Sequence, residues 1–142
     1  MNREILFKAK RKDNGEWVEG YLFDNGMTKL KRYFIGGIII EPYEGTACDE
    51  WNIVGIDFCE IDIDTLCQYT GLTDKNGKKI WENDIVRNEK GDIGVVQWFE
   101  EHAAFMIWNK TKHYICYLAE NDFSKIEIAG NEFDNPELLE VE

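Results

Sequence analysis

The sequence predicts a mainly β fold, with a small, partly open barrel in residues 58–142 and β-hairpins in residues 1–57 packed on it. Three observations predict this fold. Asn-Gly turn signals recur, apolar and polar residues alternate between them, and the C-terminal half contains short strands separated by polar turns. A chain of 142 residues is long enough to bury a core as a single domain, and we expect only one or two short helices.

The first two strands are expected on either side of a strong hairpin signal. Residues 4–9 alternate in apolar and charged side chains, which is typical of a strand with one buried face. Asp13-Asn14-Gly15 favours a tight turn, and residues 17–23 form the returning strand. Asp24-Asn25-Gly26 then predicts a second turn at its end.

The next part of the chain, residues 24–57, has the weakest pattern. Ile38-Ile39-Ile40 predicts a short buried strand, and residues 43–52 predict a surface loop. Residues 58–66 alternate again and predict a strand with Ile61 and Ile63 on one face.

The segment on which the chain is organised runs from Gln68 to Arg87, QYTGLTDKNGKKIWENDIVR. Asp74-Lys75-Asn76-Gly77 predicts a tight turn in which Gly77 takes a positive φ. Strands precede and follow this turn. Asn83 stands between the apolar stretches, and asparagine is the non-glycine residue that best tolerates a left-handed backbone.

This segment resembles the hallmark of the YopX family of phage and prophage proteins, whose members read close to QYTGLKDKNGKEIYEGDIV. The sequence departs from that pattern at Trp81, where tyrosine is usual, and at Asn83, where glycine is usual. The resemblance extends to both ends of the chain, is looser between residues 24 and 57, and implies a phage or prophage protein with no established activity. The first 12 residues alternate charged and apolar side chains and lack the continuous apolar core of a signal peptide, so we expect a protein of the bacterial cytoplasm, and we expect no cofactor. The motif residues, expected to shape the turn and lead into the barrel, are Tyr69, Gly71, Leu72, Asp74, Asn76, Gly77, Ile80, Trp81, Asp84 and Val86.

After the hallmark the chain has the character of an SH3-like meander. Residues 93–98 and 105–108 predict successive strands, and glycines at 91 and 94 allow the strong coiling that a small barrel needs. A turn at residues 110–112, a helical turn near residues 118–124 and an edge strand at residues 126–128 follow. Pro136 then suits the first position of a last short helix.

Charge is the strongest compositional fact, with a formal net value of −12. Such a chain is unsuited to binding phosphate backbones, so nucleic acid is an unlikely partner. The charge is uneven, however: residues 1–12 sum to +4 and residues 120–142 to −7. An acidic tail is usually a solvated surface, but it can also meet a basic partner or imitate DNA.

Chemical sites are poorly supported. The four cysteines lack CxxC spacing, so we expect reduced thiols and no zinc. Glu60, Asp62 and Asp64 stand in a row along one strand, which an acidic surface explains without a cation. His102 and His113 lie in no catalytic motif, and the glycines of the hallmark lack the spacing of a phosphate loop. We therefore expect no enzyme and no metal site. No stretch approaches the roughly 20 apolar residues of a membrane span.

The aromatic residues point instead to protein binding. Trp98 and Phe99 are adjacent on one strand, so their rings must lie on opposite faces and one lies outside the main core. With Trp108 they form the expected partner surface, because exposed aromatic residues are common interface anchors. The sequence therefore predicts a non-enzymatic module that binds itself, as a homo-oligomer, or a host or phage protein. The alternative is a nucleic-acid-linked role, through DNA mimicry or weak direct binding.

Overall fold

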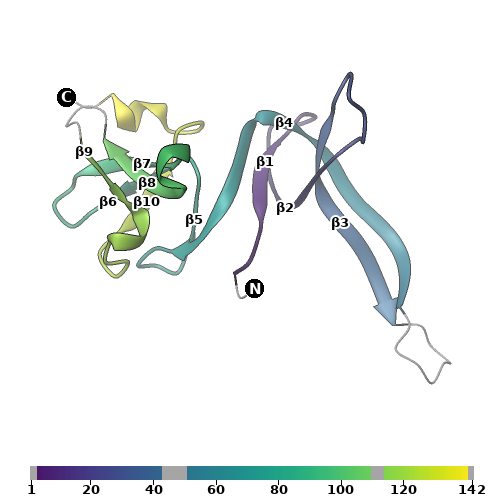
Figure 1. Cartoon of the computed structure of the whole chain (residues 1–142), viewed down its shortest axis with the longest axis horizontal. Helices are drawn as coiled ribbons and strands as arrows, with labels where there is room; N and C mark the ends of the chain where they lie inside the picture. The colour runs from purple at the N-terminus through teal and green to yellow at the C-terminus, as the bar shows by residue number, and fades with distance from the viewer. Residues whose placement is uncertain (1–2, 43–50, 110–113, 141–142) are drawn as a thin grey trace. The chain divides into compact units, whose positions relative to one another are not determined.

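The computed structural model describes residues 3–42, 51–109 and 114–140, and it is built from antiparallel strands (Figure 1). It divides into two compact units. The N-terminal unit is Leu6–Leu66, and the C-terminal unit contains Met1–Ile5 and Cys67–Glu142. The prediction of a mainly β protein is confirmed. The predicted single domain, with regions 1–57 and 58–142, stays a prediction.

Four strands build the N-terminal unit. They are β1 (Phe7–Arg11), β2 (Trp17–Asp24), β3 (Tyr33–Pro42) and the first part of β4 (Trp51–Thr73). The neighbours pair in chain order, and β1 also pairs with β4. Ala9, Ile35 and Ile61 are fully buried between these strands. Because β2 pairs with β1 through its first half and with β3 through its second, the four strands enclose a small core.

The hairpin of β3 and β4 extends beyond β2. Residues 38–42 of β3 pair with residues 51–56 of β4 (Figure 1). The register shifts after Ile39, where the ladder has a bulge. The predicted strand at Ile38-Ile39-Ile40 is therefore part of a longer one. Most of the loop predicted at residues 43–52, and the turn predicted at 110–112, lie outside the described residues.

The C-terminal unit contains the end of β4, which pairs with β5 (Lys79–Trp81), and a second sheet of five strands. That sheet has the order β10-β6-β7-β8-β9. Its strands are β6 (Asp84–Arg87), β7 (Ile93–Phe99), β8 (Ala104–Asn109), β9 (Tyr114–Tyr117) and β10 (Glu127–Asn131). A small, partly open SH3-like barrel is compatible with this meander and stays a prediction.

Helix is confined to three short 3₁₀ segments among the described residues. They are η1 (Glu100–His102), η2 (Leu118–Glu120) and η3 (Pro136–Leu139). The second lies where the sequence predicts a helical turn, and the third begins at the proline expected to start it. The core of the C-terminal unit is formed by Ile80, Val86, Val96, Ile107, Leu118 and Ile126.

Candidate binding surfaces

Asp74 anchors the first turn of the hallmark segment, residues 68–87. Its side chain is buried, and Oδ1 accepts hydrogen bonds from the backbone N–H of Asn76 and Lys78 at 2.8 and 2.9 Å. Oδ2 accepts another from the N–H of Ile128 in β10 at 3.0 Å. Burial raises the pKa of Asp74, but these donors outweigh burial and hold the pKa below its ordinary value. The carboxylate thus shapes the turn and joins it to β10.

The second turn of the hallmark has the left-handed backbone that the sequence predicts. Asn83 has φ of 70°, where the family pattern has glycine, and its Nδ2 contacts Cys67 Sγ at 3.5 Å. Gly77, in the first turn, has φ of 77°. Asp84 follows Asn83 directly, and its buried Oδ2 accepts a hydrogen bond from the N–H of Trp81 at 2.8 Å. Both bends are therefore held by side chains of the motif itself.

Most of the remaining motif residues line the interior, and Gly71 is exposed. The rings of Tyr69 and Trp81 are both buried, and their centroids lie 5.5 Å apart. Ile80 and Val86 belong to the core, and Leu72 packs against it. Gly71 adopts φ of 88°. The contacts of these residues lie within the C-terminal unit, and the motif therefore shapes that unit.

The three residues predicted as a partner surface do not share one face. Trp98 is 47% exposed, and its ring meets Phe105 at 5.1 Å between centroids. Phe99 and Trp108 are half-buried. Trp108 pairs with Val95, which lies on the same side of β7 as Phe99 and opposite to Trp98. Trp98 is therefore the exposed ring of the adjacent pair, and it lies on the opposite face of β7 from the other two. A partner surface formed by these residues stays a prediction.

A larger exposed apolar surface lies on the N-terminal unit, and sequence reasoning missed it. The rings of Phe23, Phe34 and Phe58 come from β2, β3 and β4 and form a cluster with centroids 5.4–5.8 Å apart. Phe23 is 38% exposed and Phe58 is 48% exposed. We call these three rings the aromatic cluster. Ile56, two residues before Phe58, is 62% exposed and extends it. The sequence signal that could have indicated this surface is the spacing of two residues between apolar side chains, such as Ile56 and Phe58, on a strand that pairs with another.

A basic residue and an acidic residue border the aromatic cluster. Arg32 lies over the Phe34 ring and donates two hydrogen bonds to Glu60, at 2.6 and 2.8 Å. These hydrogen bonds from Arg32 lower the pKa of Glu60 to about 2. Glu60 is the first member of the carboxylate row formed with Asp62 and Asp64. Its negative charge is neutralised by Arg32. Among the described residues no group of three or more His, Cys, Asp or Glu side chains is placed to hold a metal ion.

The loop between β2 and β3, residues 25–32, presents apolar side chains beside this cluster. Leu30 is 86% exposed and has φ of 55°, which is strained for a leucine. Asn25 braces the loop: its Nδ2 donates to the carbonyl of Leu30 at 3.1 Å, and its Oδ1 accepts from the N–H of Arg32 at 3.3 Å. The backbone N–H of Asn25 also donates to the carbonyl of Arg32. The loop is ordered around an exposed leucine.

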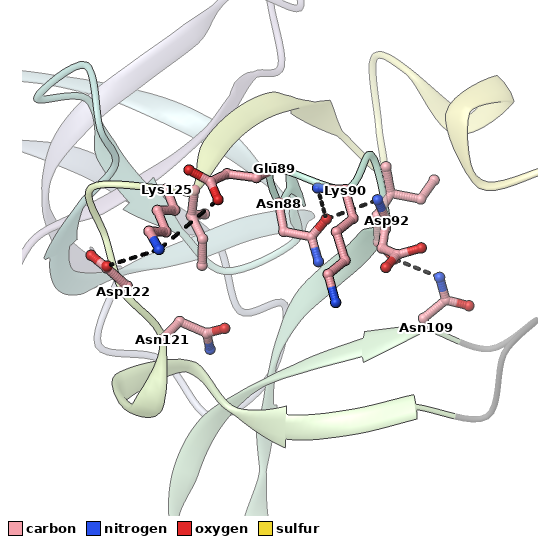
Figure 2. A pocket seen from close by; sticks show the side chains of 10 residues that line it. Asn88, Glu89, Lys90, Asp92, Asn109, Asn121, Asp122 and Lys125 are labelled. Atoms are coloured by element: carbon pink, nitrogen blue, oxygen red, sulfur yellow. Dashed lines mark hydrogen bonds and ion pairs between the residues drawn. The ribbon is translucent and has the colours of Figure 1, made fainter.

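The C-terminal unit has a half-open cavity of about 460 Å³ (Figure 2). Ile93 and Ile126 supply its apolar lining. The polar lining residues, with several side chains pointing toward the hollow, are Asn88, Glu89, Lys90, Asp92, Asn109, Asn121, Asp122 and Lys125. Lys125 Nζ lies 4.0 Å from carboxylate oxygens of both Glu89 and Asp122. The cavity therefore combines an apolar lining with a polar rim of three carboxylates, two lysines and three asparagines. In the described part of the chain, no helix is long and apolar enough to cross a membrane.

These features define a two-unit, all-antiparallel β protein with exposed apolar surfaces. The sequence profile described as "YopX protein" matches residues 6–140, and the chain belongs to the YopX family. Protein EF1440 from Enterococcus faecalis has a similar solved structure, with 21% sequence identity, a TM-score of 0.60 and coverage of 97% of this chain and 99% of that one. Protein yopX from Bacillus subtilis is 14% identical, with a TM-score of 0.49 and coverage of 94% and 97%. No curated protein matches the sequence.

Proposed function

We propose that this chain is a non-enzymatic phage or prophage accessory protein that acts in the bacterial cytoplasm by binding protein, including copies of itself. The observation that carries the proposal is the aromatic cluster of the N-terminal unit. Its three rings would gain from being covered, because burial of apolar surface stabilises by roughly 25 cal/mol per Å². Exposed apolar patches of this kind commonly mark interaction sites.

The distribution of exposed apolar residues supports the N-terminal unit as the binding part. Of the large apolar side chains that are exposed in the described residues, seven lie within Leu6–Leu66: Tyr21, Phe23, Met27, Leu30, Ile56, Phe58 and Ile63. Four lie in the C-terminal unit: Ile5, Trp98, Ile115 and Tyr117. The smaller of the two units therefore carries more of the exposed large apolar side chains among the described residues.

The nucleic-acid alternative gains little from the charges near the N-terminus. Arg11 forms an ion pair with Asp13, and Lys12 lies 3.5 Å from Glu60. Lys8 Nζ lies 4.7 Å from the ring of Trp17. Basic residues that are engaged within the unit must give up these contacts to displace counterions from a phosphate backbone, which is the main source of nucleic-acid affinity.

The test uses Phe58→Ser, with Ile115→Ser as the matched control. Ile115 is exposed to a similar extent, at 44%, but lies in the C-terminal unit. Sedimentation velocity over a range of concentrations measures self-association, and nuclease-treated pulldown from a bacterial lysate measures binding to other proteins. We expect Phe58→Ser to weaken binding and Ile115→Ser to leave it unchanged. A wild-type monomer that retains no protein, or equal behaviour of both variants, would overturn the proposal.

A further inference from the structure

We infer that Leu30 of one copy inserts into the cavity of the C-terminal unit of a second copy, so that the chain assembles head to tail. This inference rests on the proposed function and names the contact and the partner. Two otherwise unexplained features carry it: an exposed leucine on an ordered, strained loop, and a cavity that combines an apolar lining with carboxylates.

The loop is built to present its apolar side chain. A leucine gains nothing within its own chain from being 86% exposed, and a left-handed backbone is strained for a residue with a Cβ. The hydrogen bonds of Asn25 to Leu30 and Arg32 nevertheless hold this conformation. The N–H of Gly26 donates to Asp24 Oδ1 at 2.7 Å and fixes the start of the loop. A backbone held in this way has little conformational entropy left to lose when the loop binds, which lowers the cost of association.

The charge of the loop favours an acidic partner, and the C-terminal unit of a second copy is acidic. The loop reads Lys29-Leu30-Lys31-Arg32, a basic segment in a chain of net charge −12. Lys31 pairs with Asp24 at 3.4 Å and Arg32 pairs with Glu60. Lys29 has no ion-pair partner within the described ranges. The complement of this loop is an apolar pocket with carboxylates at its rim, and residues Met1–Ile5 and Cys67–Glu142 of this same chain carry a net charge of −7.

The cavity has the matching chemistry. Ile93 and Ile126 provide apolar surface, and its volume of about 460 Å³ lies in the range of ordinary ligand pockets, roughly 300–1,000 Å³. Glu89, Asp92 and Asp122 give its rim three carboxylates against the two ammonium groups of Lys90 and Lys125. Leu30 would occupy the apolar part, and Lys29 would meet the carboxylates. Because the two surfaces differ, the contact is heterologous and leads to a ring or an open filament.

Two variants separate this contact from effects on folding. Leu30→Asn removes the apolar side chain, and asparagine tolerates the left-handed backbone, so thermal stability should be unchanged or higher. Lys90→Trp places a ring at the mouth of the cavity. Lys90 is exposed, and only its backbone N–H supports the local turn, through Asn88 Oδ1 at 3.0 Å. We expect each variant alone to sediment as a monomer where the wild type forms assemblies larger than a dimer.

Mixing the two variants is the decisive measurement. A Leu30→Asn chain keeps an intact cavity, and a Lys90→Trp chain keeps an intact loop, so the mixture should form one heterodimer and grow no further. Recovery of association on mixing supports the head-to-tail contact. Wild-type-like association of either variant alone, or two monomers in the mixture, would overturn it. If Phe58→Ser weakens binding in that case and Ile115→Ser does not, the proposed function survives and only the contact assigned here fails.

Discussion

The carboxylate of Asp74 accepts a hydrogen bond from the backbone N–H of Ile128, 54 residues further along the chain. The same side chain closes the hallmark turn through the N–H groups of Asn76 and Lys78. One buried residue therefore links the sequence hallmark to a strand near the end of the chain. This link explains why an acidic residue at this position belongs to the motif.

Asp74→Asn should destabilise the C-terminal unit. Asparagine has one acceptor oxygen, so its amide group would face either the Ile128 N–H or the turn donors, and a buried donor would lose its partner at a cost of roughly 1–3 kcal/mol. Urea unfolding at neutral pH measures the loss, with Asp64→Asn as an exposed control. Because the pKa of Asp74 is lowered by folding, its contribution is present above the unfolded-state pKa and disappears as the pH falls through the folded one. A difference that persists at the lowest pH would contradict this account.

Asn83 tests the left-handed bend of the second turn. Asn83→Gly should be nearly neutral, because glycine adopts φ of 70° without strain and loses only the contact to Cys67. Asn83→Ala should cost roughly 1 kcal/mol, since a Cβ without a local hydrogen bond is disfavoured there. Thermal unfolding of the two variants side by side checks the order. Equal stability of both would show that the backbone conformation is not the constraint.

Two adjacent glycines in β3 should respond differently to alanine. A Cβ at Gly36 would overlap the carbonyl oxygen of Asp57 and the backbone of Phe58, whereas a Cβ at Gly37 would meet only the Tyr21 ring, at 3.7 Å. We expect Gly36→Ala to cost roughly 1–3 kcal/mol and to loosen the aromatic cluster through β4. Gly37→Ala is the matched control. Chemical denaturation gives the cost, and a similar loss from both substitutions would count against this packing.

Glu82 predicts a pH dependence of opposite sign. Burial raises its pKa above the ordinary value of 4.5, although the N–H of Gln68 donates to the carboxylate and lowers it in part. The folded state therefore binds this proton more tightly than the unfolded state. The stability of the wild type falls as the pH rises from the unfolded-state pKa of Glu82 through its higher folded-state pKa. Glu82→Gln keeps an acceptor for Gln68 and removes the titration. Relative to wild type it should be more stable at pH 7 than at pH 4.

The control for that experiment is Glu137→Gln, an exposed glutamate in η3. This substitution removes one carboxylate from an exposed position and therefore controls for the change in net charge. A Glu82→Gln difference that is constant between the two pH values would show that burial of this carboxylate does not limit stability.

Local signals made much of the fold predictable. Asp74 and Gly77 indicate a turn by their own chemistry, and Asn83 indicates a left-handed bend, so short-range rules were sufficient. The strand that begins at Trp17 and the short helix that begins at Pro136 are predictable for the same reason.

The binding surface is harder to predict from the sequence than the turns. Trp98 and Trp108 are close in sequence, but β7 and β8 place them on different faces of the sheet.

The aromatic cluster depends on pairings that the sequence does not state. Phe23, Phe34 and Phe58 come from three strands, and they meet only because β3 pairs with both β2 and β4. Residues 28–34 show no clear alternation of apolar and polar side chains, so the sequence does not indicate that Phe34 lies on the same face as the other two rings. The left-handed backbone of Leu30 gave no sequence signal at all, because leucine rarely adopts it. Long-range register and local strain were the missing information.

The sheet order of the C-terminal unit has a consequence for synthesis on the ribosome. β6 pairs with β10, and the Arg87–Glu127 contact joins residues 40 positions apart. At about 5–20 residues per second, roughly 2–8 seconds pass between the synthesis of these partners. During that interval the outer edge of β6 has no strand beside it, so the nascent chain is exposed to pairing with other chains. This edge of β6 is therefore covered only once β10 has been synthesised.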